Sequence, residues 1–329
     1  ANKALLAEHG NEIFSIARDH GKVIYFEASV GAGIPIIKSL REGLTVDRFK
    51  RIFGILNGTS NFILSAMSER GLDFNQALAQ AQKHGFAEKK ASLDIQGIDS
   101  LHKLIILVYL CFGKLVNIND VFVDGIERVS LLDVFYAKEL GYHIKLLAIA
   151  RKEGDELELR VHPTLIPQDN LLAKVTGINN AIYVSSDLAG DLLFFGPGAG
   201  KNAAASAVVS DLQDAVRDLQ SGLFRRKFSV VEDKTVKSLR VIDRTKSRYY
   251  IRFMVVDKPG VLAAISSVLA KYDISIASVT QKERKKANIV PIVMIIHDVI
   301  ERDLRLALAK IRNLVMVKEL PVAIRIEQI

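Results

Sequence analysis

Cysteine, tryptophan and long apolar runs are what this 329-residue chain has least of. Its single cysteine, Cys111, cannot form a disulfide within the chain, which fits the reducing cytoplasm where we expect the protein to reside. Cys111 lies in the apolar stretch 104–112, a setting that predicts a buried structural thiol and not a nucleophile. Because no run of eighteen apolar residues occurs, we expect no membrane-spanning segment and no membrane partner.

Aromatic residues make up only 7% of the chain, and no recognised nucleic-acid-binding signature occurs. The net charge of +8 would by itself suit a polyanionic partner. Without aromatics or a signature, we expect no nucleic-acid partner and instead a basic surface that attracts small anions. The first residues lack the basic leader and cleavage site of a signal peptide, and they also lack an initiator methionine.

The length predicts two or three domains, and the spacing of apolar residues indicates where they lie. Two short helices are expected before residue 22, then a strand at 22–27, a long helix at 131–147 and β-rich chain up to 195. A helix rich in small residues is expected at 202–220. Residues 221–247 are charged and predict an irregular linker. The last unit alternates strand, helix, strand, strand, helix and strand, the order of a ferredoxin-like fold.

An acid-rich segment, 85–103, runs directly into the apolar stretch. Asp99 and Lys103 are four residues apart and share one face if the segment is helical. One interpretation is an ordinary ion pair at a helix start, and the spacing alone favours it. The other is a buried lysine whose pKa is tuned for proton transfer, because burial lowers the pKa of a lysine and neighbouring carboxylates raise it.

Two glycine-rich turns, 31–33 and 196–200, stand between expected strands and helices, where backbone amides can meet phosphate. Neither has the full dinucleotide-binding fingerprint, so each is first interpreted as a packing turn. The first turn follows Glu27, and a carboxylate beside a looped backbone can gather oxygens around one hard cation. The carbonyls of Val30, Ala32 and Ile34 would complete such a site, although a simple tight turn explains the pattern equally well.

Several motifs occur in an order that resembles the homoserine dehydrogenase family. They are Ala1-Asn-Lys-Ala, Phe26-Glu-Ala-Ser-Val-Gly-Ala-Gly-Ile-Pro-Ile-Ile, Gly54-Ile-Leu-Asn-Gly-Thr-Ser-Asn-Phe, Gly85-Phe-Ala-Glu, Asp94-Ile-Gln-Gly-Ile-Asp followed by Lys103, and Gly196-Pro-Gly-Ala-Gly. The last unit, with Asp257-Lys-Pro-Gly-Val-Leu after its first strand, resembles an ACT regulatory domain. The resemblance covers almost the whole chain.

The resemblance implies an enzyme of threonine and methionine biosynthesis that interconverts L-homoserine and L-aspartate 4-semialdehyde with NADP or NAD. It implies a general acid/base role for Lys103, and for Lys3 a second active-site role near the nicotinamide. It further implies these roles: substrate amino-group binding by Glu88, Asp94 and Asp99, a monovalent Na⁺ or K⁺ site at Glu27, Val30, Ala32 and Ile34, and a cofactor contact at Gly200.

Two further sites combine the resemblance with local pattern. Asn57, Gly58 and Thr59 form a turn that opens a helix, and we interpret them as contacts of the substrate carboxylate, with a plain turn as the alternative. Asp257, Pro259, Gly260 and Val261 open the first helix of the ACT-like unit, where amides can take an effector's carboxylate. L-threonine is the implied effector, and a homodimer or tetramer is the implied assembly; a unit that only dimerises is the alternative.

The fold class implied is α+β: a mixed-sheet catalytic and dimerisation domain followed by a ferredoxin-like βαββαβ domain. We expect residues 1–21 to be the end of a Rossmann-like nucleotide-binding domain, 22–220 the catalytic domain, 221–247 the linker and 248–329 the ACT domain. Helix 199–220 is expected to pack back on the nucleotide-binding part. With most of that part absent, the chain alone is expected to bind dinucleotide poorly and to be inactive.

One departure from the family pattern and two rival functions remain. Lys89-Lys90-Ala91 replaces the usual Ala-Asp-Pro or Pro-Asp-Pro, which puts the charge and shape of that loop in doubt. A non-catalytic amino-acid sensor built around the ACT-like unit would not need Lys103 or Lys3. Another amino-acid dehydrogenase with a related substrate domain is the third interpretation. The residues that choose NAD or NADP are not found in this sequence.

Overall fold

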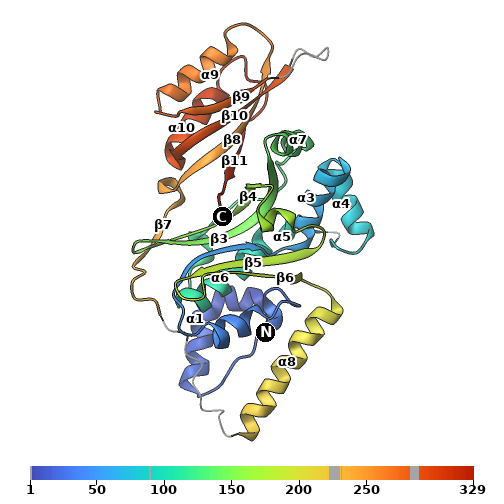
Figure 1. Cartoon of the computed structure of the whole chain (residues 1–329), viewed down its shortest axis with the longest axis vertical. Helices are drawn as coiled ribbons and strands as arrows, with labels where there is room; N and C mark the ends of the chain where they lie inside the picture. Colours follow the sequence, from blue (N-terminus) through green and yellow to red (C-terminus); the bar gives the residue numbers. More distant parts are fainter. Residues whose placement is uncertain (1, 89, 222–229, 231, 282–288) are drawn as a thin grey trace.

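A computed structural model describes residues 2–88, 90–221, 230, 232–281 and 289–329 (Figure 1). Its helices are α1 (Lys3–Asp19), α2 (Ile36–Lys38), α3 (Gly58–Arg70), α4 (Phe74–Lys83), α5 (Ser92–Ile95), α6 (Ile98–Phe112), α7 (Leu131–Glu139), α8 (Lys201–Gln220), α9 (Val261–Ala270) and α10 (Glu301–Arg312). Its strands are β1 (Phe49–Ile55), β2 (Phe122–Val123), β3 (Tyr142–Glu153), β4 (Glu156–Pro167), β5 (Asn179–Ser186), β6 (Asp191–Pro197), β7 (Ser238–Arg240), β8 (Lys246–Val256), β9 (Ile276–Thr280), β10 (Ile289–Ile300) and β11 (Val322–Ile326).

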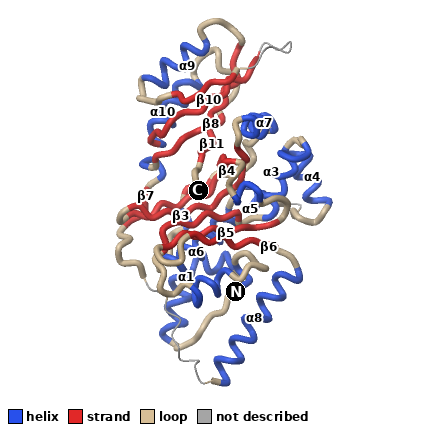
Figure 2. Tube along the Cα trace, viewed as in Figure 1, coloured by secondary structure: helices blue, strands red, loops and turns tan. Residues whose placement is uncertain are grey.

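The described strands join into one sheet in the order β6-β5-β1-β3-β4-β11-β8-β10-β9. Figure 2 shows this sheet as a continuous band of strands, with α1, α6 and α8 on one side of its first half and α9 and α10 beside its second half. The first half is antiparallel from β6 to β4, and the long β3–β4 hairpin forms its centre. The mixed α+β fold class expected from the sequence is confirmed.

Helix α6 forms the main core on one face of the first half of the sheet. Nearly every one of its residues is buried, including Leu104, Ile105 and Leu107, and α1 packs beside it through Leu6 and Phe14. The expected apolar stretch is therefore a central helix, as its composition predicted. Cys111 lies on this helix, and burial raises the pKa of its thiol, which agrees with a structural and not a nucleophilic role.

The C-terminal unit has its own core and the strand order β11-β8-β10-β9, with α9 and α10 packed on one face. In order of occurrence along the chain these strands are fourth, first, third and second, the arrangement of a ferredoxin-like fold. The βαββαβ prediction is confirmed. Strand β11 also pairs in parallel with β4, through Arg325 with Thr164 and Ile326 with Leu165, so the two halves share one sheet.

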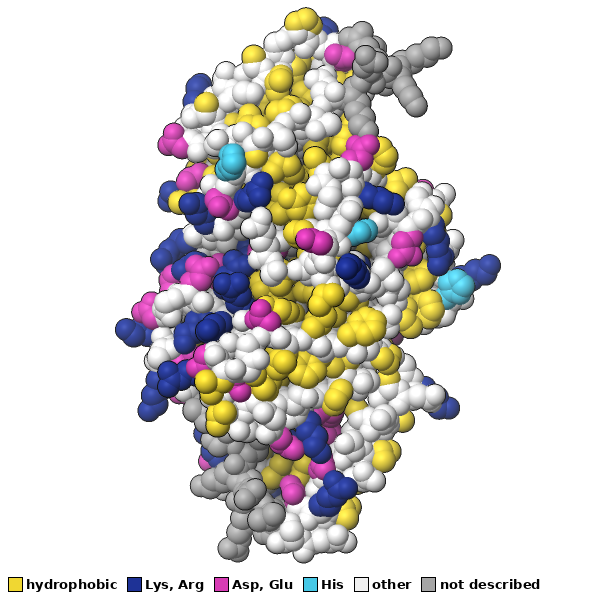
Figure 3. Space-filling model, viewed as in Figure 1, with side chains coloured by type: hydrophobic (Ala, Val, Ile, Leu, Met, Phe, Trp, Pro, Cys, Tyr) yellow, Lys and Arg dark blue, Asp and Glu magenta, His cyan; other side chains and the backbone are white. Residues whose placement is uncertain are grey.

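Buried charges hold the junction between the two halves. Arg160 on β4 has no exposed surface and forms ion pairs with Glu158 and with Glu327, which follows β11. Glu327 also accepts a hydrogen bond from Arg151 at 2.6 Å. On the space-filling surface, acidic and basic side chains intermix along the left edge of the molecule at mid-height (Figure 3). The two halves are therefore joined by charge pairing as well as by strand pairing.

Three local expectations are corrected. The β-rich segment 22–27 forms no strand; it is irregular chain ending in a 3₁₀ turn, held by α8 through Tyr25 to Asp218 at 2.5 Å. The helix expected at 131–147 ends at Glu139, because Gly141 adopts φ +83° and the following residues pair as β3. The expected linker contains ordered structure, since β7 pairs with β4 and β8 begins at Lys246. Residues 222–229 and 231 lie outside the described part.

Helix α8 lies against the segment that precedes α3. Its Asp211 accepts the backbone N–H of Glu27 at 2.9 Å, and its Asp214 accepts the Lys38 ammonium at 2.6 Å. The other side of α8 exposes a row of apolar side chains: Val208, Val209, Leu212, Val216 and Leu219. The expectation that this helix packs on a nucleotide-binding part stays a prediction. Within the described residues no helix is both long and apolar enough to cross a membrane.

Candidate active site

The candidate site begins where β1 leads into α3. Asn57 has extended backbone angles, and its side-chain Oδ1 accepts the N–H of Ser60 at 2.8 Å, which caps the helix. A side chain at Gly58 would place its Cβ 2.7 Å from the carbonyl oxygen of Ile178, so only glycine fits there. The Asn-Gly pair thus forms the N-terminus of α3. The backbone amides of Gly58 and Thr59 come before the amide of Ser60, which the Asn57 side chain caps.

Helix α6 supplies the second wall of the site. Gly97 starts it with φ +83°, and the Cβ of a larger residue would also meet Val123 and Val161 at 3.2 Å. Asp99 then lies in the first turn and Lys103 in the next, so both point the same way. Both side chains are buried, with 7% of the Asp99 side chain and 9% of the Lys103 side chain exposed. The ion pair at a helix start that spacing alone favoured is present, and it is buried.

The Lys103 ammonium is held at two points. Its Nζ donates to Asp99 Oδ2 at 2.7 Å and to the carbonyl oxygen of Leu56, at the end of β1, at 2.5 Å. Burial lowers the pKa of Lys103, and the positive charge of Lys3 lowers it further, whereas Asp99 and Asp94 act in the opposite direction. An ammonium has three N–H donors, so one stays available beyond these two contacts.

Asp99 is the hub of the cluster. Its Oδ1 forms an ion pair with Lys3 from the start of α1, while its Oδ2 serves Lys103. Burial acts to raise the pKa of Asp99, but Lys103 and Lys3 together hold it well below its usual range. The structure thus brings Lys3 and Lys103 to one carboxylate.

Asn57 connects Asp99 to Asp94. Its Nδ2 donates to Asp94 Oδ1 at 2.7 Å and to Asp99 Oδ2 at 2.9 Å. Burial raises the pKa of Asp94; the bond from Asn57 opposes this rise, and the charge of Asp99 adds to it. The side chain of Asn57 is therefore fully used in orienting the two acids and capping α3, and only the backbone of this turn can meet a substrate carboxylate.

Glu88 is not brought into this cluster. Its side chain is exposed, and its backbone carbonyl accepts a bond from Gln82 at 3.3 Å. The side chain of Thr59 is used in a structural hydrogen bond. Its Oγ1 donates to the carbonyl of Phe86 at 2.6 Å, which holds the turn before Glu88 against α3. The neighbouring Lys89 lies outside the described residues, so the effect of the Lys89-Lys90-Ala91 departure stays a prediction.

The two glycine-rich turns meet each other. The N–H of Gly33 donates to the carbonyl of Pro197 at 3.1 Å, and a Cβ at Gly33 would clash with that proline. Gly200 follows with φ +122° and starts α8 with no side-chain cap, so the first amides of this helix are open to a ligand. The expected cofactor contact at Gly200 therefore stays a prediction.

The Glu27 carboxylate has partners that the sequence did not indicate. Its Oε1 and Oε2 accept the N–H groups of Ile37 and Lys38 at 2.9 and 2.8 Å. Burial raises its pKa to about 7, and these two bonds oppose the rise. Ala32 adopts φ +30° in the same loop, while the carbonyl of Ile34 accepts a short local bond from Ile36. The carbonyls of Val30 and Ala32 are thus the freer part of the expected cation site.

The expected effector turn opens α9 as the sequence indicated. Gly260 caps the helix in the left-handed conformation with φ +88° and no side-chain cap, and Val261 is buried in the core of the C-terminal unit. Asp257 and Pro259 precede it at the end of β8. This placement agrees with the expectation and leaves the effector itself untested.

Sequence reasoning missed two buried polar side chains beside the site. Asn180, at the start of β5, donates from Nδ2 to the carbonyl of Leu56 at 2.9 Å, the oxygen that also accepts from Lys103. Lys145 on β3 donates to the Asn61 amide oxygen at 3.2 Å, and burial lowers its pKa to about 8. The only signal was a polar residue at the edge of an apolar strand, which by itself indicates nothing specific.

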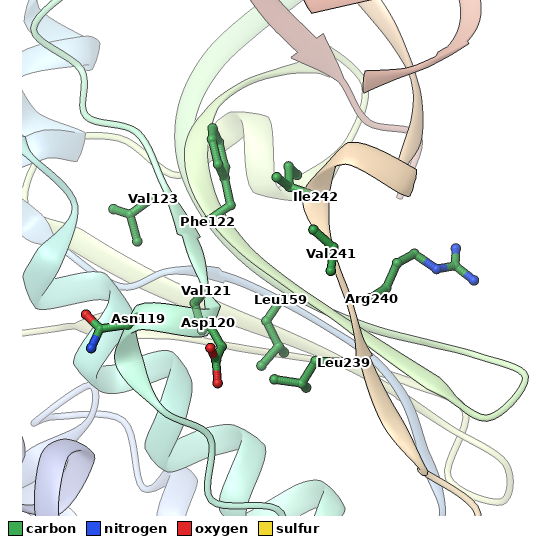
Figure 4. A pocket seen from close by; sticks show the side chains of 10 residues that line it. All are labelled: Asn119, Asp120, Val121, Phe122, Val123, Leu159, Leu239, Arg240, Val241 and Ile242. Atoms are coloured by element: carbon green, nitrogen blue, oxygen red, sulfur yellow. The ribbon is translucent and has the colours of Figure 1, made fainter. Parts of the chain in front are cut away.

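A pocket of about 610 Å³ lies away from this cluster, where the outer edge of β4 is uncovered between β7 and β2. Figure 4 shows Phe122 and Leu239 among the residues that line it, with Asp120 at its lower side and the guanidinium of Arg240 turned outward. Arg240 is already paired with acidic residues of the β3–β4 hairpin. None of the residues of the lysine–acid cluster lines this pocket. The candidate active site is therefore identified by its ionisable side chains and not by the size of a cavity.

Fold and site together define a mixed α/β domain with a buried lysine–acid cluster, followed by a ferredoxin-like unit, and comparison with known proteins makes this specific. Residues 35–213 match the family described as homoserine dehydrogenase, and residues 249–315 match the ACT domain. The homoserine dehydrogenase of Pseudomonas aeruginosa is 44% identical over 333 aligned residues, covering 100% of this chain and 77% of the relative. That of Neisseria gonorrhoeae is 43% identical, covering 100% and 76%.

Solved structures agree with these sequences. A homoserine dehydrogenase from Thiobacillus denitrificans superposes with a TM-score of 0.91 at 43% identity, covering 99% of this chain and 75% of that one. A hyperthermophilic archaeal homoserine dehydrogenase in complex with NADPH matches 66% of this chain and 63% of that one, at 31% identity and a TM-score of 0.58. The chain belongs to the homoserine dehydrogenase family and carries an ACT domain. A sensor without a catalytic domain is thereby excluded.

Proposed function

We propose that this protein interconverts L-homoserine and L-aspartate 4-semialdehyde with Lys103 as its proton donor and acceptor. The observation that carries the assignment is the buried Lys103 ammonium, fixed by Asp99 and by the Leu56 carbonyl with one N–H left over. In the reduction, that N–H meets the aldehyde oxygen, stabilises its developing charge and delivers the proton. In the oxidation, neutral Lys103 takes the hydroxyl proton, and the burial-lowered pKa increases the share of Lys103 in that neutral form.

Lys3 and Asp99 adjust this lysine. Asp99 orients the ammonium, and its charge favours the protonated state of Lys103, whereas the charge of Lys3 favours proton release. Lys3 is about two-fifths exposed on its side chain, so it can also face the cofactor while it pairs with Asp99. The pair therefore sets how readily Lys103 exchanges its proton.

The substrate's two charged ends have matching partners. Asp94 and Asp99 form an acidic pocket for the amino group, and Asn57 orients both carboxylates. The amides of Gly58 and Thr59, at the positive end of α3, suit the substrate carboxylate. Glu88 is assigned a role only through family resemblance, and reaching the amino group requires its loop to move inward from the position described.

The cofactor is NADP or NAD, which when bound supplies the hydride donor or acceptor. Gly200 and the uncapped N-terminus of α8 fit the part of it that lies on this chain. Na⁺ or K⁺ at the loop of Glu27, Val30, Ala32 and Ile34, L-threonine at Asp257–Val261, a homodimer or tetramer and a cytoplasmic location complete the proposal. They are supported by the oxygen-rich loop, the open amides of α9 and family resemblance.

The test is direct. The natural polypeptide at its full length is incubated with L-homoserine and NADP or NAD, and the absorbance of the reduced nicotinamide is followed, with L-serine as the comparison substrate. Homoserine-dependent reduction is expected, and L-serine should support little because its hydroxyl is one carbon closer to the acidic pocket. A folded protein that reduces neither cofactor on L-homoserine would overturn the proposal.

A further inference from the structure

The Leu56 carbonyl that holds Lys103 is itself held by a second donor. Asn180 Nδ2 lies 2.9 Å from this oxygen, and Lys103 Nζ lies 2.5 Å from it. Asn180 sits at the start of β5, one residue before the pair Ala181–Ile55 of the β5–β1 ladder, so its side chain continues the sheet contact to Leu56. Both Asn180 and Leu56 have no exposed surface. Two buried donors therefore meet at one backbone oxygen.

Asn180 makes its hydrogen bond to the Leu56 carbonyl while its own amide oxygen stays unpaired within the described part of the chain. Its Oδ1 is buried and has no hydrogen-bond partner among the described residues. The orientation of the amide is settled, because only its NH₂ group can donate to a carbonyl oxygen. Leaving a buried acceptor unpaired costs free energy that an apolar side chain would avoid. Stability alone does not account for an asparagine at this position.

Gly198 presses on the same amide from the other side. A Cβ built on Gly198 would lie 2.0 Å from Asn180 Cγ and 2.1 Å from its Nδ2, closer than any real contact. Asn180 is paired with Gly196, and Asn179 with Pro197, in the β5–β6 ladder, so the residues directly before Gly198 are held beside Asn180. The amide is thus confined between the turn that leads into α8 and the carbonyl that holds Lys103.

We propose that Asn180 is a positioning residue for Lys103: its carboxamide fixes the Leu56 carbonyl and hence the ammonium, and Gly198 must lack a side chain to leave room for it. The glycine-rich turn before α8 and the proton-donating lysine are then mechanically connected through one amide. This inference rests on the proposed role of Lys103. It adds a residue that contacts neither substrate nor cofactor in the proposed mechanism.

Charge makes Asn180 a sensitive probe. The groups that face Lys103 are Asp99 on its own helix, Asp94 from α5 and Lys3 from α1. Asn180→Asp would add a carboxylate beside the Leu56 carbonyl without changing the size of the side chain. A new negative charge favours the ammonium form, so the pKa of Lys103 should rise. Asn180→Ala would instead free the carbonyl and let the ammonium move.

The experiment compares Asn180→Ala, Asn180→Asp and Asn179→Asp in the full-length protein, with kcat and KM for L-homoserine measured across pH. Asn179 is the matched control, because its Nδ2 donates to the carbonyl of Thr176 at 3.1 Å and to no other group in the described part of the chain. Asn180→Ala should lower kcat about tenfold or more, because small misplacements of a catalytic group cost that much, with KM changed by less than about threefold. Asn180→Asp should shift the pH dependence of kcat that reflects Lys103 to higher pH. Asn179→Asp should change neither kcat nor its pH dependence.

A second variant pair tests the role of Gly198. Gly198→Ala should lower kcat as Asn180→Ala does, but it should add little in the Asn180→Ala background, where the amide that it strikes is gone. Nuclear magnetic resonance of the ¹³Cε of lysine, assigned with Lys103→Met, gives the pKa without any activity. If both Asn180 variants keep the wild-type pH dependence of kcat and the wild-type pKa of Lys103, the inference is overturned. This holds even if Lys103→Met is inactive, because that result supports only the role of Lys103. A wild type without activity would instead count against the proposed function.

Discussion

Lys103 and Asp99 lie one turn apart on α6 and are joined by a 2.7 Å hydrogen bond inside the protein. A buried ion pair of this kind is weak evidence for stability, because removing two charges from water costs about as much as their attraction returns. The second carboxylate oxygen of Asp99 meets Lys3, so one acid serves two lysines. This relationship suits proton transfer better than it suits structural support.

Replacing Lys103 by methionine keeps the apolar stem and removes the proton donor. We expect kcat to fall by roughly 10²–10⁴-fold, the usual contribution of general acid–base catalysis. Cofactor binding, followed by fluorescence titration, should change little. The matched control is Lys114→Met, which removes a half-buried lysine paired with the exposed Glu232 and should leave kcat near the wild-type value. Near-normal turnover by Lys103→Met would remove Lys103 from the mechanism.

The direction of the reaction sets the sign of its pH dependence. Reduction of the semialdehyde needs protonated Lys103, so its rate should fall as pH rises through the pKa of Lys103; oxidation of homoserine should show the opposite limb. Asp99 acts to raise this pKa, so Asp99→Asn should move both limbs to lower pH. Rates measured across pH in both directions check this, with exposed Asp120→Asn as the control. Limbs that stay in place would contradict the assignment.

Glu27 links stability to pH and to cations. Its pKa in the folded protein is about 7, above its ordinary 4.5. Its contribution to stability is therefore fully present below the ordinary pKa and is lost as pH rises through about 7. In a choline salt, Tm should fall between about pH 5 and pH 8, and Na⁺ or K⁺ should restore it at the higher pH, because a bound cation offsets the carboxylate charge.

The same measurement on Glu27→Gln should show neither the pH effect nor the cation effect. Glu42→Gln, which changes an exposed carboxylate nearby, should retain both. Equal Tm in Na⁺, K⁺ and choline at the higher pH would leave the loop as a tight turn without a cation.

L-threonine binding at the ACT unit should appear as thermal stabilisation. A ligand that binds only the native state raises Tm, by an amount that grows with its concentration. Asp257→Asn should reduce the shift, because it weakens the partner proposed for the ammonium of threonine. Asp298→Asn is the control, since Asp298 is exposed on β10 at the other end of the same sheet. If no amino acid shifts Tm, the unit serves assembly only.

Removing one partner from the buried ion pairs between the two halves should lower the free energy of unfolding. Glu327→Ala would leave Arg160, which has no exposed surface, without one of its two carboxylates. We expect a loss of about 3–5 kcal/mol in the free energy of unfolding, the usual effect of removing one partner from a buried pair. Glu319→Ala, an exposed partner of Arg252 at 3.9 Å, should cost almost nothing. Urea unfolding of both variants measures the difference.

Local pattern was sufficient where residues near in sequence make the structure. The spacing of Asp99 and Lys103 placed both on one face of a helix, and the order of elements after residue 248 predicted the ferredoxin-like unit. Local pattern failed at 22–27, where a β-rich segment has no strand to pair with, and at 142–147, where the chain after Gly141 pairs as β3 and does not continue the helix. A strand exists only with its partner, and the sequence of one segment does not contain that partner.

By itself, therefore, the sequence determined the family motifs, the lysine–acid helix and the two-part organisation, because propensity, spacing and turn chemistry act over a few residues. Only the tertiary structure decided that Lys3 reaches Asp99, that Asn57 spends its side chain on two acids, and that Glu88 stays outside the cluster. It also placed Asn180 on the carbonyl that holds Lys103. These contacts join residues far apart in the chain, and burial, which the fold alone creates, gives their charges and hydrogen bonds their strength.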